Sequence, residues 1–231
     1  MLKLLFPLLL IASSAFAQSF RVGVEGGIPL TNAFDTGIQT VAPTVVIGFP
    51  TYASYKSATK RYTVGVTAEL GLPFHLAIKA DALYKRVGFD SFIPVTPLLF
   101  GPTWNNTRAN SFEFPVMAKY RLSKLGPLQP YIEGGVSFRT LEGATETLTT
   151  GCAECPQGAA PVTATPSPVY GLNHSFTKGI TAGAGLELRH LPVGAFGEVR
   201  YTRWTAEAFS DPRGGLNSLR NQADLLVGVT F

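Results

Sequence analysis

The sequence has little of what several large protein classes require. Beyond residue 17 it has no run of about 18 or more consecutive apolar residues, which excludes a helical membrane protein. It contains two cysteines and three histidines, so a four-ligand zinc site is not expected, and we expect no metal or cofactor. Charged residues make up 15% of the chain, the net charge is +4, and no basic run suggests nucleic acid as a partner.

The first residues have the pattern of a secretory signal peptide. Lys3 provides a short positive region, residues 4–12 are apolar apart from one proline, and Ala17 ends a small-residue cleavage motif. The alternative is a buried N-terminal helix. We expect residues 1–17 to be cleaved and residues 18–231 to form one β-barrel domain.

Most of the remaining chain alternates between apolar and polar or small residues with a period of two, which predicts β-strands. The predicted strands are residues 20–28, 61–71, 76–85, 112–121, 131–139, 176–189, 195–202 and 222–231. Short connections alternate with long ones at residues 29–60, 87–110, 140–174 and 205–220. This order predicts an all-β, eight-stranded antiparallel up-and-down transmembrane barrel, with short periplasmic turns and four long extracellular loops.

Alternation alone does not distinguish a membrane barrel from a soluble barrel with an apolar ligand cavity. The polar face is rich in small residues and charges, which suits a narrow interior. The apolar face carries aromatic residues near the strand ends, as in the two interfacial girdles of membrane barrels. These residues are Phe20, Tyr120 and Phe231 at one end, and Tyr62, Tyr84, Phe112, Phe138, Phe176 and Tyr201 at the other.

Each predicted strand contributes one carboxylate to the interior face: Glu25, Glu69, Asp81, Glu113, Glu133, Glu187, Glu198 and Asp224. Basic residues share these faces: Arg21, Arg61, Lys79, Lys85, Lys119, Arg121, Arg139, Arg189 and Arg200. Enclosed charges cost several kcal/mol each unless they are paired. We therefore expect an interlocked ion-pair network that plugs the lumen; a charged pore or proton pathway is the alternative.

Five segments carry a resemblance to a known family: residues 77–84, 112–115, 130–135, 198–202 and 225–231. With these, the chain resembles the OmpA-like outer-membrane β-barrel proteins, also described as opacity-type or porin-family barrels. The resemblance implies location in the bacterial outer membrane, contact with its lipids and lipopolysaccharide, and recognition of Phe231 by the barrel-assembly machinery. It implies structural, adhesive or weakly pore-forming roles without choosing among them.

Three local features have their own interpretations. Cys152 and Cys155 lie in the third long connection, and in an oxidising envelope a short disulfide between them is expected. Pro115 cannot donate to a strand ladder, which predicts a bulge or a local bend in the fourth strand. Outward positions beyond the outer girdle carry four basic residues that could pair with lipopolysaccharide phosphates or simply snorkel at the interface: Lys60, Arg86, Lys178 and Arg203.

Three functions remain open. The first is a non-enzymatic surface barrel whose long loops contact an extracellular ligand. The second is a narrow channel for small solutes. The third is a lipid A-modifying enzyme, for which His75, His174 and His190 form no catalytic arrangement with a nucleophile in the predicted topology, so no enzyme is expected.

Overall fold

The computed structural model describes residues 20–41, 51–94, 102–151, 162–190, 193–211 and 215–231. The predicted signal peptide and the two cysteines lie outside these ranges, so their cleavage and pairing stay predictions. Within the described ranges, no helix is long and apolar enough to span a membrane.

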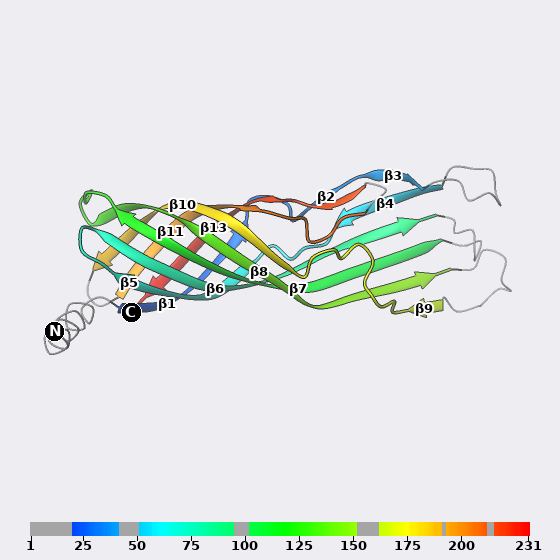
Figure 1. Ribbon diagram of the computed structural model, residues 1–231, viewed down its shortest axis with the longest axis horizontal. Coiled ribbons are helices and arrows are strands. Elements are labelled where there is room, and N and C mark those ends of the chain that lie inside the picture. The colour runs from blue at the N-terminus through cyan, green and yellow to red at the C-terminus, as the bar shows by residue number, and fades with distance from the viewer. Residues whose placement is uncertain (1–19, 42–50, 95–101, 152–161, 191–192, 212–214) are drawn as a thin grey trace, which may run out of the picture.

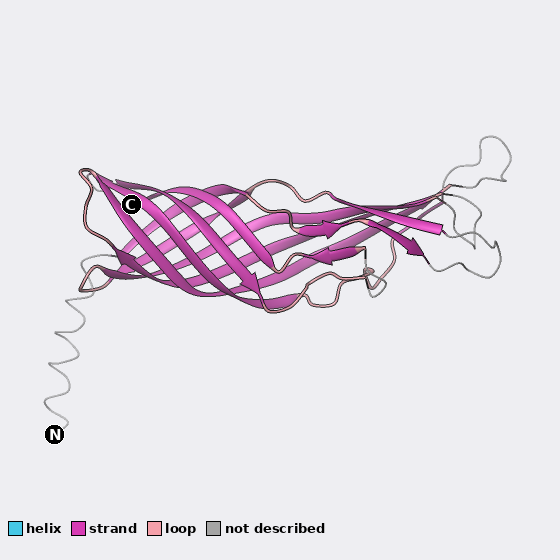
Figure 2. Cartoon of the chain, turned by 90° about the horizontal axis from the view of Figure 1, so that it is seen from above, coloured by secondary structure: helices cyan, strands magenta, loops and turns pink. Residues whose placement is uncertain are grey.

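Eight strands of the described chain form a closed antiparallel ring, as Figures 1 and 2 show. Each pairs with its neighbours along the chain, and the last pairs with the first, for example at Val24 and Val229. The predicted fold class is therefore confirmed. The ring strands are β1 (Phe20–Pro29), β5 (Thr63–Gly71), β6 (Leu76–Ile93), β7 (Thr103–Arg121), β8 (Leu128–Thr150), β10 (Phe176–His190), β11 (Val193–Trp204) and β13 (Asn221–Thr230).

Several predicted loops are in fact β-structure. β6, β7 and β8 remain paired far beyond the ring, so that residues 87–93, 103–110 and 140–150 are strand rather than loop. Other parts of the long connections contribute short strands to the same end of the molecule: β2 (Phe34–Thr36), β3 (Ile38–Val41), β4 (Thr51–Ser57), β9 (Val162–Ala164) and β12 (Leu216–Ser218). We call this end of the molecule the extension; it lies opposite the C-terminus in Figure 1.

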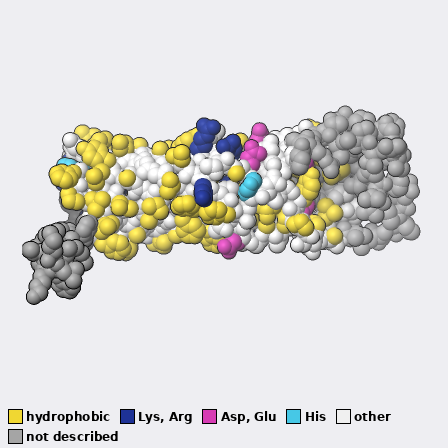
Figure 3. Space-filling model, in the orientation of Figure 1, with side chains coloured by type: hydrophobic (Ala, Val, Ile, Leu, Met, Phe, Trp, Pro, Cys, Tyr) yellow, Lys and Arg dark blue, Asp and Glu magenta, His cyan; other side chains and the backbone are white. Residues whose placement is uncertain are grey.

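The strands bury the polar face and expose the apolar face, as the alternation predicts. In β1, Val22 and Val24 are exposed whereas Glu25 is buried. β11 repeats the pattern with exposed Val199 and Tyr201 around buried Arg200. Figure 3 shows hydrophobic side chains spread over the half of the surface nearer the chain termini. An apolar outer band around a polar interior is the arrangement that lipid on the outside requires.

Of the two outcomes predicted for Pro115, a bulge or a local bend, the bulge is wrong. Ala80 pairs with Val116 and Leu83 pairs with Glu113, so the register between β6 and β7 is the same on both sides of the proline. The ladder to β6 is interrupted there without a shift, because the missing donor removes a hydrogen bond but adds no residue. The irregularity lies higher in β7, between Arg108 and Asn110.

Candidate functional site

The interior of the ring contains all eight predicted carboxylates, and every one is buried. Three predicted basic members differ from the rest. Arg61 is exposed, because β5 begins only at Thr63 and the chain bends before it, so its assignment to the interior is wrong. The side chain of Arg189 lies outside the described part of the structure. Arg21 is partly exposed at the short-turn end, where it lines a pocket together with Glu69 and Arg121. The other charges fall into three groups along the barrel axis, starting from that end.

The lower ring joins two cations and two carboxylates in a closed cycle. Lys119 Nζ lies 3.0 Å from Glu69 and 2.8 Å from Glu187. Arg121 binds Glu187 through Nε at 2.7 Å and also binds Glu69. Each carboxylate is therefore shared by two cations from β7. These contacts offset much of the free-energy cost of burying the charges.

The central group has more acid than base. Lys79 Nζ is 2.8 Å from Glu198 and 3.6 Å from Glu25. Arg200 binds Asp81 at 2.7 Å and also binds Glu198. Glu133 is the fourth carboxylate, 3.9 Å from Lys79 and 3.6 Å from Arg200. Both carboxylate oxygens of Glu25 lack a hydrogen-bond donor in the described structure.

The upper group lies nearest the extension. Lys85 Nζ is 2.9 Å from Glu113 and 3.8 Å from Asp224. Arg139 stacks over the indole ring of Trp204 at 4.2 Å and donates from Nε to Thr177 at 3.1 Å. The face of Trp204 and the hydroxyl of Thr177 stabilise this buried guanidinium. The three groups together fill the lumen with charged side chains, and within the described structure each of these except Arg139 forms an ion pair.

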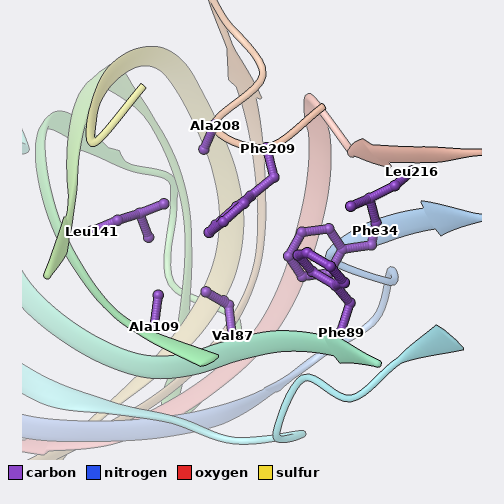
Figure 4. Packing of buried hydrophobic residues seen from close by; sticks show 8 residues of the cluster. All are labelled: Phe34, Val87, Phe89, Ala109, Leu141, Ala208, Phe209 and Leu216. Atoms are coloured by element: carbon purple, nitrogen blue, oxygen red, sulfur yellow. The ribbon is translucent and has the colours of Figure 1, made fainter. Parts of the chain in front are cut away.

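An apolar plug lies above the charged groups, where the sequence predicted only loops. Phe34, Phe89 and Phe209 contact one another edge to face, with ring centroids 5.4 to 5.8 Å apart. Figure 4 shows these rings beside Leu216, with smaller residues facing them. The plug consists of Phe34, Val87, Phe89, Ala109, Leu141, Ala208, Phe209 and Leu216. Strand residues thus meet residues from two folded connections and close the barrel mouth.

The four predicted rim residues are all exposed on the outer surface. They form two pairs rather than one cluster. Lys60 donates its backbone N–H to the carbonyl of Arg86 at 3.0 Å on the β5–β6 side. Lys178 and Arg203 lie on β10 and β11, which are neighbours on the opposite side of the ring. Figure 3 shows Lys and Arg side chains where the hydrophobic half of the surface ends.

Aromatic side chains of the outer girdle contact one another over part of the barrel circumference. Tyr84 contacts Tyr62 and Phe112 on its two sides, with centroids 6.4 and 5.4 Å away. At the other end of the barrel, Phe231 exchanges backbone hydrogen bonds with Val22 and its ring is exposed. The terminal aromatic therefore lies at the seam where β13 meets β1.

The two histidines whose side chains the structure describes lie at opposite ends of the barrel. His75 lies in the short turn before β6 with a φ of 64°. His174 is exposed, and its Nδ1 lies 3.0 Å from the carbonyl oxygen of Glu207. The side chain of His190 is outside the described structure. The contacts of His174 give it no nucleophile and no orienting carboxylate.

A closed antiparallel ring with an apolar outer band is the architecture of outer-membrane barrels. The chain matches the family model for the outer membrane protein beta-barrel domain over residues 16–204 and belongs to this family. It is thus a protein of the bacterial outer membrane, and the resemblance noted from the sequence is confirmed. The short turns then face the periplasm and the extension faces outward.

Comparisons with solved structures give distant similarities. The neisserial surface protein NspA is 10% identical, with 91% of this chain and 95% of that chain covered and a TM-score of 0.42. OprG from Pseudomonas aeruginosa is 14% identical, with coverages of 92% and 94% and a TM-score of 0.48. Ail of Yersinia pestis is 8% identical, with coverages of 93% and 100% and a TM-score of 0.40. No curated protein matches the sequence.

Proposed function

We propose that this outer-membrane protein is a closed barrel that acts at the cell surface, through contacts made by its extension, and does not conduct solutes. The observation that carries the proposal is the stacking of two different seals in one lumen. The charged groups occupy the membrane-spanning part, and the apolar plug closes the outward end above them. A solute crossing the barrel would have to separate the ion pairs of the charged groups and also displace the apolar plug.

Each seal opposes permeation for its own reason. Separating the ion pairs of the lower ring leaves uncompensated charge in a low-dielectric interior, which costs several kcal/mol. Parting the Phe34, Phe89 and Phe209 rings removes large apolar surfaces from contact, at a cost of about 25 cal/mol per Å² exposed. Eight strands also leave an interior only wide enough for side chains.

The surface role is supported by the order of the extension. β6, β7 and β8 extend it as paired strands, and Asn106 and Arg108 both bind Asp90 on its outer face. A rigid surface loses less conformational entropy on binding a partner than mobile loops do. A folded extension is therefore better suited to recognition than a set of solvated loops.

Planar-bilayer recording of the purified protein tests the proposal. A closed lumen gives no steady openings above the lipid background at voltages at which porins conduct. Steady openings abolished by Glu69→Gln or Arg139→Gln would establish a pore through the charged lumen and contradict the proposal. Mass spectrometry of lipid A from cells with and without the protein tests the enzymatic alternative: a lipid A mass change that depends on the protein would contradict a purely interactive role.

A further inference from the structure

Two aromatic side chains face outward on the extension, where the other outward positions of β6 and β7 are polar or small. Phe92 and Trp104 lie opposite each other, with ring centroids 5.5 Å apart and ring planes tilted by 38°, and Trp104 is 48% exposed. From Tyr84 of the girdle to Phe92 is about 26 Å along β6, at roughly 3.3 Å per residue. A membrane interface is only about 5–8 Å thick on each side. The pair is therefore in water, above the lipid headgroups.

The two rings form the apolar part of a groove of about 450 Å³ on the outer face of the extension. This volume is in the range of small-molecule sites. In the same row across four paired strands, Ser54 of β4 flanks Phe92 and Thr149 of β8 flanks Trp104. The apolar area is thus two rings wide with a hydroxyl on either side, which is much narrower than the core of a protein interface.

A polar row crosses the same four strands next to the aromatic pair, on the side of the membrane. It consists of Lys56, Asp90, Asn106 and Thr147, and all four line the groove. Asn106 donates to Oδ1 of Asp90 at 2.7 Å, and Arg108 donates to the same atom at 3.1 Å. These contacts hold the carboxylate in place while its side chain stays 44% exposed. The row therefore presents both donors and acceptors along one edge of the rings.

We infer that the groove binds a pyranose ring of an extracellular oligosaccharide, with equatorial hydroxyls as in β-linked glucose units. Such a ring carries only C–H groups on its faces and all of its hydroxyls on its edge. One face packs on Trp104, as apolar groups do on aromatic rings, and the edge hydroxyls bond Asp90 and Asn106, because a hydroxyl both donates and accepts. This inference rests on the proposed surface function and names the class of its ligand.

Tryptophan fluorescence provides the first test. The chain has two tryptophans, and Trp204 is buried in the barrel, so a collisional quencher reaches Trp104. For the full-length protein in a detergent without a sugar headgroup, cellotetraose should lower the quenching by acrylamide by about half or more, since a stacked ring covers the exposed indole face. Sorbitol, which has hydroxyls but no ring, should not lower it. Equal protection by the two compounds, or protection by neither, would overturn the inference.

Isothermal titration calorimetry with cellotetraose tests the residues. Trp104→Ala should weaken binding about tenfold or more, whereas Trp104→Phe keeps a ring and should retain most of the affinity. Asp90→Ala should weaken binding about fivefold, the usual effect of one lost hydrogen bond. Glu142→Ala is its matched control, because Glu142 is an exposed carboxylate on β8 outside the groove, and it should change nothing. Unchanged affinity in Asp90→Ala would overturn the inference even if Trp104→Ala does not fold.

Vesicles test the source of the saccharide. Trp104 should be quenched as strongly in vesicles containing lipopolysaccharide as in vesicles of phospholipid alone, and cellotetraose should protect it in both. Protection by lipopolysaccharide without a response to cellotetraose would overturn the extracellular source. Bilayer recordings assess the closed lumen separately: a silent barrel that binds no saccharide would refute this inference alone, and a conducting barrel that binds cellotetraose would refute only the closed lumen.

Discussion

The hydroxyl of Tyr131 donates a hydrogen bond to Oε2 of Glu198 at 2.7 Å, and the ring of the same tyrosine lies 3.7 Å from Lys119 Nζ. Glu198 belongs to the central group and Lys119 to the lower ring. One side chain therefore links two ion-pair groups that share no residue. Removal of its hydroxyl tests this link while keeping the ring under Lys119.

Tyr131→Phe should lower the free energy of unfolding by about 1.5–3 kcal/mol, the usual value of a hydrogen bond to a charged group. Denaturant titration in lipid vesicles measures this. Tyr120→Phe is the matched control, because Tyr120 is 44% exposed on the apolar outer face, and it should change stability by much less. Equal effects of the two variants would show that the Tyr131 hydroxyl does not stabilise the interior.

The excess of acid in the central group predicts opposite responses from two of its carboxylates. Glu25 has no hydrogen-bond donor and lies 3.6 Å from Lys79, so Glu25→Gln should leave stability unchanged or raise it. Glu198 binds Lys79, Arg200 and Tyr131, and Glu198→Gln should cost about 3–5 kcal/mol because it breaks a buried pair. The same unfolding assay compares them. A larger loss from Glu25→Gln than from Glu198→Gln would contradict this assignment of partners.

Two adjacent glycines of β8 should differ sharply in tolerance. A Cβ on Gly135 would overlap the carbonyl oxygen of Val116 and lie 2.7 Å from Cα of Met117. A Cβ on Gly134 would meet nothing nearer than the Thr181 carbonyl oxygen at 3.8 Å. Gly135→Ala should therefore cost about 1–3 kcal/mol or more through backbone displacement, and Gly134→Ala should fold normally. The folded fraction after dilution into vesicles reports the difference, and a folded Gly135→Ala barrel of wild-type stability would refute it.

The positions of the four rim residues determine how much lipopolysaccharide the purified protein should lose when they are neutralised. Since Lys60 and Arg86 are separated from Lys178 and Arg203 by the width of the barrel, neutralising either pair should release only part of the lipid retained on the purified protein. Phosphate analysis after detergent exchange measures retention. Unchanged retention with all four neutralised would leave interfacial snorkelling as their role.

The membrane-spanning part of the barrel follows closely from the sequence. Alternation with a period of two assigned the inner and outer faces of the strands, including the burial of Glu69 and Lys119, because one face must meet lipid and the other cannot. Arg61 was misassigned because alternation does not mark where a strand ends. Tyr131 and Phe196 alternate onto the predicted inner face. The hydrogen bond of Tyr131 to Glu198 and the position of the Phe196 ring, 4.6 Å from Lys79 Nζ, depend on cross-barrel distances that no single strand encodes.

The sequence does contain a signal for the extension, although the extension was predicted as loops. In β6 the inward positions change from Lys85 to Val87 and Phe89, while the outward positions change from Tyr84 to Gly88 and Asp90. The apolar face turns from lipid to interior because water replaces lipid outside beyond the girdle. This inversion of hydrophobicity, and not the loss of alternation, marks the membrane boundary. Contacts to Phe34 and Phe209 remained unpredictable, because they join separate long connections that no local sequence pattern relates to one another.

The most direct test of a closed lumen is the reactivity of a thiol placed between the two seals. Ser111 is fully buried in β7. It lies between Glu113, which belongs to the upper charged group, and the plug residue Ala109. In a background with both native cysteines replaced by serine, Ser111→Cys should resist a charged, water-soluble thiol reagent added from either side of the membrane, and should react on unfolding. Asn106→Cys, on the exposed outer face, should react at once. Modification of Ser111→Cys in the folded barrel at a rate near that of Asn106→Cys would contradict the closed lumen.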